Sequence, residues 1–302
     1  MRFVPNKTPQ RTTALAIMRA MQLIVISGLS GSGKSIALNV LEDNGYYCVD
    51  NLPCWLLPQL VGRLEQEDQP AVAVAIDVRG GDSVRQLPHQ IESLAATGVS
   101  ARFLFLDAKN ETLIQRFSET RRRHPLSADD RTLPEAIAAE RQLLSRLTSL
   151  GHRIDTSDLK PATLRAWVRQ FIKSPSHKTA QVTVVCQSFG FKHGIPLDAD
   201  LVFDVRCLPN PYYEPELKPL TGRDAPVIEF LAALPSVNLM HDDILAYMQR
   251  WIPAYVQDGR SYLTLAIGCT GGQHRSVYMT ERIGKALQKN QTVLVRHSEI
   301  DS

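Results

Sequence analysis

The stretch that decides the fold is QLIVISGLSGSGKSIALNVLEDNG, residues 22–45. It opens with an apolar, β-branched run at 22–27, continues as GLSGSGKS at 28–35, and then follows a helical pattern that ends at Gly45. A G-x-x-x-x-G-K-[ST] loop between a buried strand and a helix directs backbone N–H groups and the helix N-terminus at phosphate oxygens. The sequence therefore predicts a nucleotide-binding loop.

Each position of this loop has a predicted task. We expect Lys34 to reach the β- and γ-phosphates and the Ser35 hydroxyl to bind Mg²⁺, so both are also predicted to act in catalysis. The glycines allow the backbone to wrap closely around the ligand. The predicted nucleotide contacts are Gly28, Leu29, Ser30, Gly31, Ser32, Gly33, Lys34 and Ser35.

Further apolar runs alternate with helical patterns along the first half of the chain. They cover residues 46–52, 71–78, 102–108 and 152–157. Continuous apolar strands that alternate with helices indicate a parallel sheet covered on both faces. We therefore expect an α/β domain, a P-loop NTPase or kinase-like parallel sheet, over residues 22–173.

An aspartate stands near the carboxyl end of three of these runs: Asp50, Asp77 and Asp107. Ligands of open parallel sheets bind at that edge, so one of the three is expected on the magnesium side of the nucleotide. Asp107 fits the pattern of an apolar run followed by Asp best and is predicted to be catalytic, while Asp50 is the alternative metal ligand. For each of them, capping a helix or turn is an equally good interpretation.

A basic run, Arg121 to His124, lies at the end of a predicted helix just before Pro125. Cations at that place offset the helix dipole, which explains them without any ligand. The functional alternative is a mobile flap of arginines that closes over a triphosphate.

The alternation of apolar runs and helical patterns stops at the polar stretch KSPSHKTAQ, residues 173–181. We place a linker there, at residues 174–180. A second, smaller α/β domain is expected over 181–290, followed by a flexible tail at 291–302. Residues 1–21 carry four basic and no acidic side chains, and we interpret them as a disordered N-terminal extension or as translation begun upstream of Met18 or Met21.

The second domain contains LTLAIGCTGGQHRSVYM, residues 263–279. A strand, a glycine-bearing turn and a helix predict an anion-binding loop built from backbone N–H groups and two basic side chains. Its predicted phosphate contacts are Thr270, Gly271, Gly272, His274 and Arg275. The spacing from Cys269 to Arg275 also matches cysteine-dependent phosphatases, and a purely structural turn is a third interpretation. Other polar groups that could share this pocket are Ser188, Lys192, His193, Arg206 and Arg223.

Bulk composition narrows the class of protein. The 302 residues are 44% hydrophobic and 22% charged, and the net charge of +3 comes from the N-terminal extension. No apolar run approaches the roughly 20 residues that span a bilayer, so we expect a cytoplasmic protein with no membrane contact. The five cysteines lack C-x-x-C spacing and are expected to be free thiols.

Taken together, these segments resemble the RapZ/YvcJ family of bacterial P-loop proteins. The resemblance rests on SGLSGSGKSIALNVLEDNGYYCVDNLP, IDVR, LFLDA with TLIQRFSETRRRHPLS, DTS, SFGFKHGIPLDADLVFDVRCLPNP and YLTLAIGCTGGQHRSVY, from about residue 22 to 290. It implies binding and slow hydrolysis of ATP and GTP, with Mg²⁺. It also implies a GTP-contacting stretch at Asp77, Val78, Arg79 and Gly80.

The same resemblance implies partners for the chain. In the enteric branch, such proteins are RNA-binding adapters that present small RNAs to an endoribonuclease, and their second domain senses an amino-sugar phosphate. This chain departs from that branch because its last residues, VRHSEIDS, lack a basic ending and carry Glu299 and Asp301. We therefore predict a nucleotide-dependent regulator with a phosphorylated-metabolite sensor, expected to be a homo-oligomer. An RNA adapter, with Lys285, Lys289 and Arg296 as local cations, is the alternative, and a cysteine phosphatase ranks third.

Overall fold

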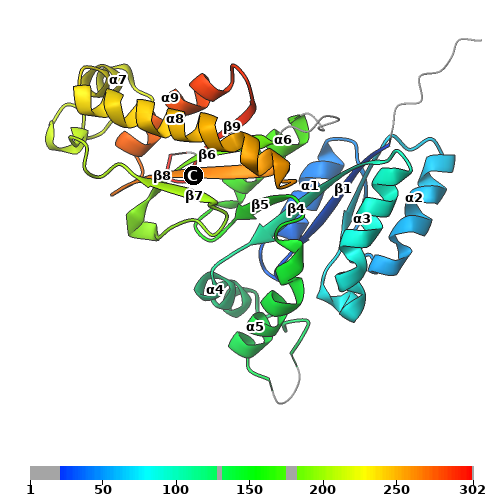
Figure 1. Cartoon of the computed structure of the whole chain (residues 1–302). Helices are drawn as coiled ribbons and strands as arrows, with labels where there is room; N and C mark the ends of the chain where they lie inside the picture. The colour runs from blue at the N-terminus through cyan, green and yellow to red at the C-terminus, as the bar shows by residue number, and fades with distance from the viewer. Residues whose placement is uncertain (1–20, 128–130, 175–181, 301–302) are drawn as a thin grey trace, which may run out of the picture.

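The computed structural model describes residues 21–127, 131–174 and 182–300. Two parallel sheets with helices around them account for these residues, and Figure 1 shows the sheets side by side. The expected α/β class is therefore confirmed. The predicted N-terminal extension, apart from Met21, and the predicted linker, apart from Ser174, lie outside the described residues.

The first sheet has five strands in the order β2-β3-β1-β4-β5, and every neighbouring pair is parallel. Its strands are β1 Gln22–Gly28, β2 Tyr47–Val49, β3 Ala71–Ala75, β4 Ser100–Asp107 and β5 His152–Asp155. The central position of β1 places the phosphate loop, which begins where β1 ends, between neighbouring strands on both sides. This is the edge at which parallel sheets bind ligands.

Helices cover both faces of this sheet because the central strands are apolar on both sides. One core cluster lies under α2 and α3, and another lies under α1 and α6. The helices are α1 Lys34–Asp43, α2 Leu57–Gln66, α3 Leu87–Ala96, α4 Asn110–Thr120, α5 Leu133–Leu144 and α6 Pro161–Lys173. Between β3 and α3 runs a 3₁₀ segment, η2 Val78–Gln86.

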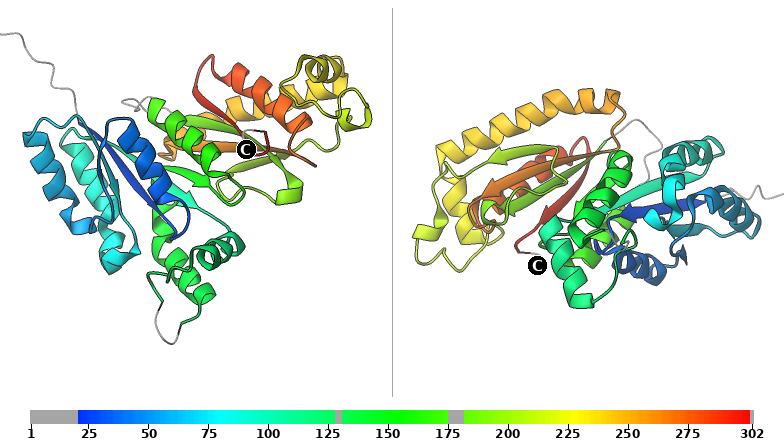
Figure 2. Two further views of the ribbon diagram at one scale, coloured as in Figure 1. Left: turned by 180° about the vertical axis from the view of Figure 1, so that it is seen from behind. Right: turned by 90° about the horizontal axis from the view of Figure 1, so that it is seen from below.

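The second sheet has four parallel strands in the order β7-β8-β6-β9. They are β6 Thr183–Gly190, β7 Leu201–Asp204, β8 Tyr262–Cys269 and β9 Thr292–His297, and the helices are α7 Ala225–Ala232, α8 Pro235–Gln257 and α9 Arg275–Leu287. Figure 2 shows the long helix α8 along one side of this sheet. In the part of the chain that the structure describes, no helix is both long and apolar enough to cross a bilayer.

The prediction of a flexible tail at 291–302 is wrong for residues 292–297. They form β9, which pairs with β6 along its length, so that Thr292 lies opposite Thr183 and His297 opposite Ser188. Val293 and Val295 pack against the second core, and Arg296 is fully buried. Sequence reasoning missed this strand because its apolar run, Val293 to Val295, is only three residues long. The polar side chains that follow this run find their partners only in tertiary contacts.

Candidate functional site

The phosphate loop begins where β1 meets β4. Gly28 has a φ of +144°, and a Cβ at this position would lie 2.1 Å from the Leu106 carbonyl oxygen, so only glycine fits. The backbone then turns through Gly31 and Gly33, both with positive φ, into the N-terminus of α1. The Lys34 ammonium donates to the carbonyl oxygens of Gly28 and Leu29 at 2.7 and 3.1 Å. Lys34 therefore connects the end of the loop to its first two residues.

A hollow of about 600 Å³ opens in front of this loop. Its walls come from the loop and α1, from the ends of β2 and β3, and from the end of α4 with the segment that follows it. The polar and charged lining residues are Ser30, Lys34, Ser35, Asp50, Asn51, Asp77, Arg79, Arg116, Glu119, Thr120, Arg122 and Arg123. The structure thus brings together the loop, two of the three predicted aspartates and part of the basic run.

Asp50 and Asp77 both face the Lys34 side of this hollow. Burial lowers the pKa of Lys34, and the negative charges of Glu140, Asp77 and Asp50 oppose that effect. Asp77 also caps η2, because its Oδ1 accepts the backbone N–H of Arg79 at 2.9 Å. Asp50 is exposed, and among the described residues its carboxylate accepts only a local bond, from the N–H of Asn51 at 2.8 Å.

The donor set fits a magnesium ion. The hydroxyl of Ser35 and the carboxylate of Asp50 are exposed oxygen donors that line one hollow, and Mg²⁺ binds through such oxygens together with nucleotide phosphates and water. Over the described ranges, no group of three or more His, Cys, Asp or Glu side chains is arranged to hold a metal by itself. A metal here would therefore depend on the bound nucleotide for its remaining ligands.

Asp107, predicted to be catalytic, does not line the hollow. Its carboxylate is 1% exposed, accepts a 2.9 Å bond from Arg141 and forms a second ion pair with Arg153. Both arginines are themselves partly covered. The strand-end position was read correctly, but two cations occupy this aspartate, which therefore has a structural role.

Two members of the predicted GTP-contacting stretch also lie away from the hollow. Val78 is 2% exposed and packs in the first core cluster, and Gly80 accepts a bond from the Ser83 hydroxyl within η2. Asp77 and Arg79 are the two residues of that stretch that line the hollow.

The basic residues of the hollow divide into two kinds. Arg116 donates to the carbonyl oxygens of Gly31 and Thr156, so it braces the phosphate loop against the end of β5. Arg122 and Arg123 are exposed at the rim, and within the described residues no hydrogen bond or ion pair holds their side chains. These two arginines are available to a polyphosphate.

Sequence reasoning missed Glu140, which lies 110 residues after the loop. Its carboxylate is fully buried and accepts both the backbone N–H of Ser30, at 2.9 Å, and the Ser30 hydroxyl, at 2.8 Å. The N–H of Ser30 therefore points at Glu140 and not into the hollow. A lone glutamate in the middle of an amphipathic helix gave no signal, because only the packing of α5 brings it behind the loop.

The second predicted site opens into a hollow of about 590 Å³ beside the start of α9. Thr270 and Arg275 line it, and so does Arg206, one of the additional polar groups named from the sequence. The remaining lining residues come from the proline-rich segment and α7: Cys207, Leu208, Pro209, Asn210, Tyr213, Glu214 and Phe230.

Arg275 lines this hollow, and one side of its guanidinium group already has hydrogen-bond partners within the protein. Its Nη1 donates to the carbonyl oxygens of Arg206 and Leu208 at 2.8 and 2.9 Å, and its Nη2 contacts the Thr270 hydroxyl at 3.4 Å. Among the described residues, the buried Nε of Arg275 has no partner. The guanidinium is thus fixed on one side and retains donor capacity on the other.

The other predicted contacts of this loop are used internally. The N–H of Gly272 donates to the Cys269 sulfur at 3.3 Å, and His274 is buried with its Nε2 3.2 Å from the Leu217 carbonyl oxygen. Gly271 packs its backbone against Gly190. These three residues shape the loop without lining the hollow, which corrects their assignment as direct contacts.

Cys269 is likewise placed below the hollow. Its side chain is 3% exposed and lies 3.1 Å from the Ser276 hydroxyl, and the residue is not part of the hollow's lining. A nucleophilic thiol would need access to the bound phosphoryl group. The phosphatase interpretation therefore gains no support from the geometry. All five cysteines are free, as the sequence predicted.

Comparisons with known proteins agree with this architecture. The sequence model of the RapZ-like N-terminal domain matches residues 21–176, and that of the RapZ C-terminal domain matches residues 182–301. The chain belongs to the RapZ family.

Its relatives are similar over almost their whole length. A nucleotide-binding protein of Aromatoleum aromaticum is 58% identical over 92% of this chain and 94% of its own, and one of Nitrosomonas europaea is 57% identical over 92% and 96%. Among solved structures, shikimate kinase from Acinetobacter baumannii is 14% identical, with a TM-score of 0.36, over 51% of this chain and 94% of its own. Gluconokinase from Sinorhizobium meliloti is 17% identical, with a TM-score of 0.32, over 51% and 94%.

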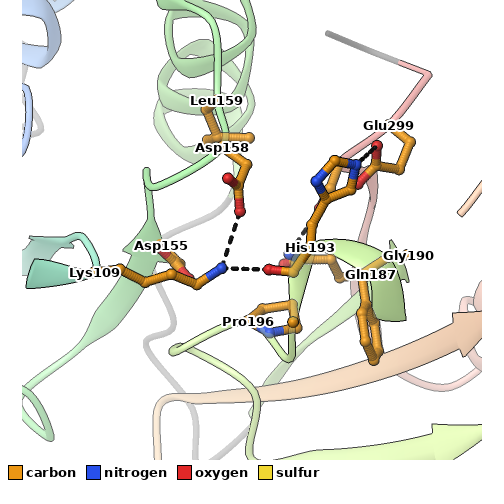
Figure 3. Close-up of a pocket in the computed structure, with 12 residues that line it drawn as sticks. Lys109, Asp155, Asp158, Leu159, Gln187, Gly190, His193, Pro196 and Glu299 are labelled. Carbon is orange, nitrogen blue, oxygen red and sulfur yellow. Dashed lines mark hydrogen bonds and ion pairs between the residues drawn. The ribbon is translucent and has the colours of Figure 1, made fainter. Parts of the chain in front are cut away.

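In this RapZ-family chain the two domains meet through polar contacts, and Figure 3 shows one of them. The Lys109 ammonium, from the first domain, points at the Asp158 carboxylate and at the carbonyl oxygen of His193 in the second. The His193 ring lies 3.1 Å from Glu299, and the backbone N–H of Lys192 donates to Thr270. The turn after β6 thus contacts both domains.

The additional polar groups expected beside the anion loop mostly have other partners. Ser188 is buried against His297, His193 faces Glu299, and Arg223 pairs with Glu281. Arg296, named as a possible RNA contact, is fully buried, so it cannot reach RNA while β9 is in place. The RNA-adapter function stays a prediction that no contact of the described residues favours.

Proposed function

We propose that the chain binds ATP and GTP together with Mg²⁺ in the hollow at the end of β1 and hydrolyses them slowly. The observation that carries this proposal is the set of charges around one hollow: Lys34 in the loop, Arg122 and Arg123 at the rim, and the exposed Asp50 carboxylate. A triphosphate needs cations on several sides, and its metal needs oxygen donors opposite them.

Within this proposal each residue has a defined role. Lys34 leaves the carbonyl oxygens that it contacts now and binds the β- and γ-phosphates. Ser35 and Asp50 hold the magnesium ion, which would neutralise phosphate charge. Asp77 holds Arg79 and the start of η2 at the rim. Phosphoryl transfer relies mainly on such positioning and charge stabilisation.

The state of the carboxylates that line the hollow supports slow turnover. Hydrolysis needs a group that orients the attacking water. Asp77 is used as a cap, Asp50 is the metal ligand in this proposal, and Glu119 accepts a bond from Gln115 at 2.9 Å. The acids that line the hollow are thus committed elsewhere, so the chain is a nucleotide-dependent switch and not a fast hydrolase.

We further propose that the second domain binds a phosphorylated metabolite, with an amino-sugar phosphate as the expected class. The partly satisfied guanidinium of Arg275, the Thr270 hydroxyl and Arg206 face one hollow and supply donors for a phosphate group. Tyr213 and Asn210 offer polar groups for the rest of the ligand.

One comparison tests the nucleotide site. Isothermal titration of Mg·ATP and Mg·GTP into wild type and Lys34→Ala should show binding at least about thirtyfold weaker in the variant, because the loop lysine supplies a charged bond worth about 2 kcal/mol or more. Lys289→Ala, which removes an exposed lysine in the second domain, is the matched control and should bind as the wild type does. Equal affinity of Lys34→Ala and wild type would refute the proposal.

A further inference from the structure

Glu140 connects two walls of the nucleotide hollow. Besides Ser30 in the phosphate loop, its carboxylate contacts Nε2 of His124 at 3.0 Å, and His124 follows directly on Arg122 and Arg123. All of these bonds are buried. We infer that Glu140 is a positioning residue for nucleotide phosphates, because it fixes the loop and the arginine-bearing segment in one arrangement before the nucleotide arrives.

The hydrogen bonds define the protonation states of the pair. The backbone N–H of Leu126 donates to Nδ1 of His124 at 3.1 Å, so Nδ1 is an acceptor and carries no proton. The proton then sits on Nε2, which donates to Glu140. His124 is therefore neutral, and Glu140 is a buried anion with three donors: the Ser30 N–H, the Ser30 hydroxyl and His124.

Electrostatics agree with an ionised carboxylate. Burial raises the pKa of Glu140, but the hydrogen bonds from His124 and Ser30 and the charge of Lys34 outweigh this, and its pKa is held below the usual range. Ionised acceptors form hydrogen bonds roughly twice as strong as neutral ones. The anion therefore holds both partners more firmly than a neutral group would.

Packing makes the arrangement specific. The His124 ring lies 5.2 Å from the Phe117 ring, and the Phe117 ring in turn lies beside Gly31 of the loop, where an added Cβ would be 3.5 Å from it. The segment after α4 is thus held against the phosphate loop at two points, by Glu140 and by Phe117. The expectation of a mobile flap is changed accordingly: Arg122 and Arg123 stand next to an anchored residue.

This arrangement lowers the entropic cost of binding. A loop and a rim that are already ordered lose less conformational freedom when a triphosphate engages them. The inference rests on the proposed nucleotide function, because the phosphate loop and the arginine-bearing segment act together only if both bind the same triphosphate. Glu140 itself touches no part of the ligand.

Three substitutions test it by titration with Mg·ATP. Glu140→Ala removes all three bonds and should weaken binding about tenfold or more. Glu140→Gln should restore most of that loss, because its amide oxygen can accept from the Ser30 N–H and His124 while its NH₂ group donates to the Ser30 hydroxyl. Glu65→Ala, an exposed position on α2, is the matched control and should bind as the wild type does.

A further variant separates positioning from folding. His124→Phe keeps a ring beside Phe117 but loses the bond to Glu140, so it should fold and still bind nucleotide more weakly. In that background Arg122→Ala and Arg123→Ala should cost less affinity than they cost in the wild type, because the arginines are no longer held in place.

The possible outcomes are distinct. If the wild type binds neither ATP nor GTP, the proposed function fails whatever Glu140 does. The positioning role is overturned if the wild type binds, Lys34→Ala binds much more weakly, and both Glu140→Ala and His124→Phe bind as tightly as the wild type. Additive losses from His124→Phe and the two arginine substitutions would overturn it as well, since an anchored segment requires coupling.

Discussion

Arg296 of the second domain lies with its Nη1 2.7 Å from Nε2 of His152 in the first, and both side chains are fully buried. Arg296 also donates from its Nε to Gln170 at 3.0 Å and lies over the Trp167 ring at 4.9 Å. Because an arginine has no acceptor, Nε2 of His152 must be unprotonated here. β9 is therefore fastened to the first domain by a buried cation whose partners are neutral.

Replacing Arg296 by Met should lower the free energy of unfolding by about 3 kcal/mol or more, because His152 and Gln170 lose their buried donor. Urea unfolding followed by tryptophan fluorescence measures this, since Trp167 lies against the substituted side chain. Arg250→Met, at an exposed position on α8, should change stability by less than about 0.5 kcal/mol. Similar losses for both variants would show that the buried contact contributes nothing.

Two buried groups near this contact, His152 and Asp198, should change the stability of the protein in opposite directions as the pH falls. Burial, with the charges of Arg296 and Arg102 beside it, holds the pKa of His152 well below its ordinary value. The unfolded chain therefore takes up a proton first as the pH falls below about 6.5, and stability decreases towards acid. Burial, with Asp155 nearby, raises the pKa of Asp198 to about 7, so there the folded chain takes up a proton first and stability increases as the pH falls.

Asp198→Asn should therefore make the protein lose stability more steeply between pH 7 and pH 5 than the wild type does, by up to about 1.4 kcal/mol per pH unit. Urea unfolding at pH 5, 6, 7 and 8 gives the slopes. Identical slopes for wild type and Asp198→Asn would mean that Asp198 titrates normally.

Substitutions of Asp50 and Asp107 should have different effects, the first on nucleotide binding and the second on stability. Asp50→Asn should weaken Mg²⁺-dependent nucleotide binding at least about tenfold and leave the unfolding midpoint almost unchanged, because the side chain is exposed. Asp107→Asn should instead cost about 3 kcal/mol of stability, because Arg141 and Arg153 lose a buried carboxylate. Nucleotide titration and thermal unfolding of both variants check this, and a selective loss of binding in Asp107→Asn would reverse the assignment.

Ligand binding in the second hollow should depend on Arg206. In the wild type an amino-sugar phosphate should raise the unfolding temperature, and Arg206→Ala should lose most of that shift while the ligand-free protein keeps its stability, because Arg206 is exposed and pairs locally with Asp204. Arg275→Ala should lose both the shift and part of the basal stability, since Arg275 also holds two backbone carbonyls. A full shift in Arg206→Ala would place the ligand elsewhere.

Cys269→Ser distinguishes a receptor from an enzyme at that hollow. We expect this variant to keep the ligand-induced shift, because the cysteine side chain lies below the lining residues. Release of inorganic phosphate from sugar phosphates should be undetectable in both wild type and variant. A wild-type activity that Cys269→Ser abolishes would revive the phosphatase interpretation.

Local sequence was sufficient for the first domain's central unit. The run at 22–27, the glycine pattern of 28–35 and the helix after it interact with their immediate neighbours, so strand, loop and helix could be predicted from spacing alone. The same holds for the parallel sheet, because apolar runs that alternate with helices leave few other arrangements. For the same reason Lys34, Ser35 and Asp50 at the end of β2 lie beside one hollow, although their roles toward a nucleotide stay predictions.

What sequence could not decide depends on contacts between distant segments. Asp107 and Asp50 look alike in sequence, yet Arg141 and Arg153 occupy the first and leave the second exposed. Glu140 lies behind a loop 110 residues away, and β9 owes its order to β6 and to the first domain. A hydrogen bond has a range of about 3 Å, so which polar groups are available to a ligand is decided only when the tertiary structure brings their partners together.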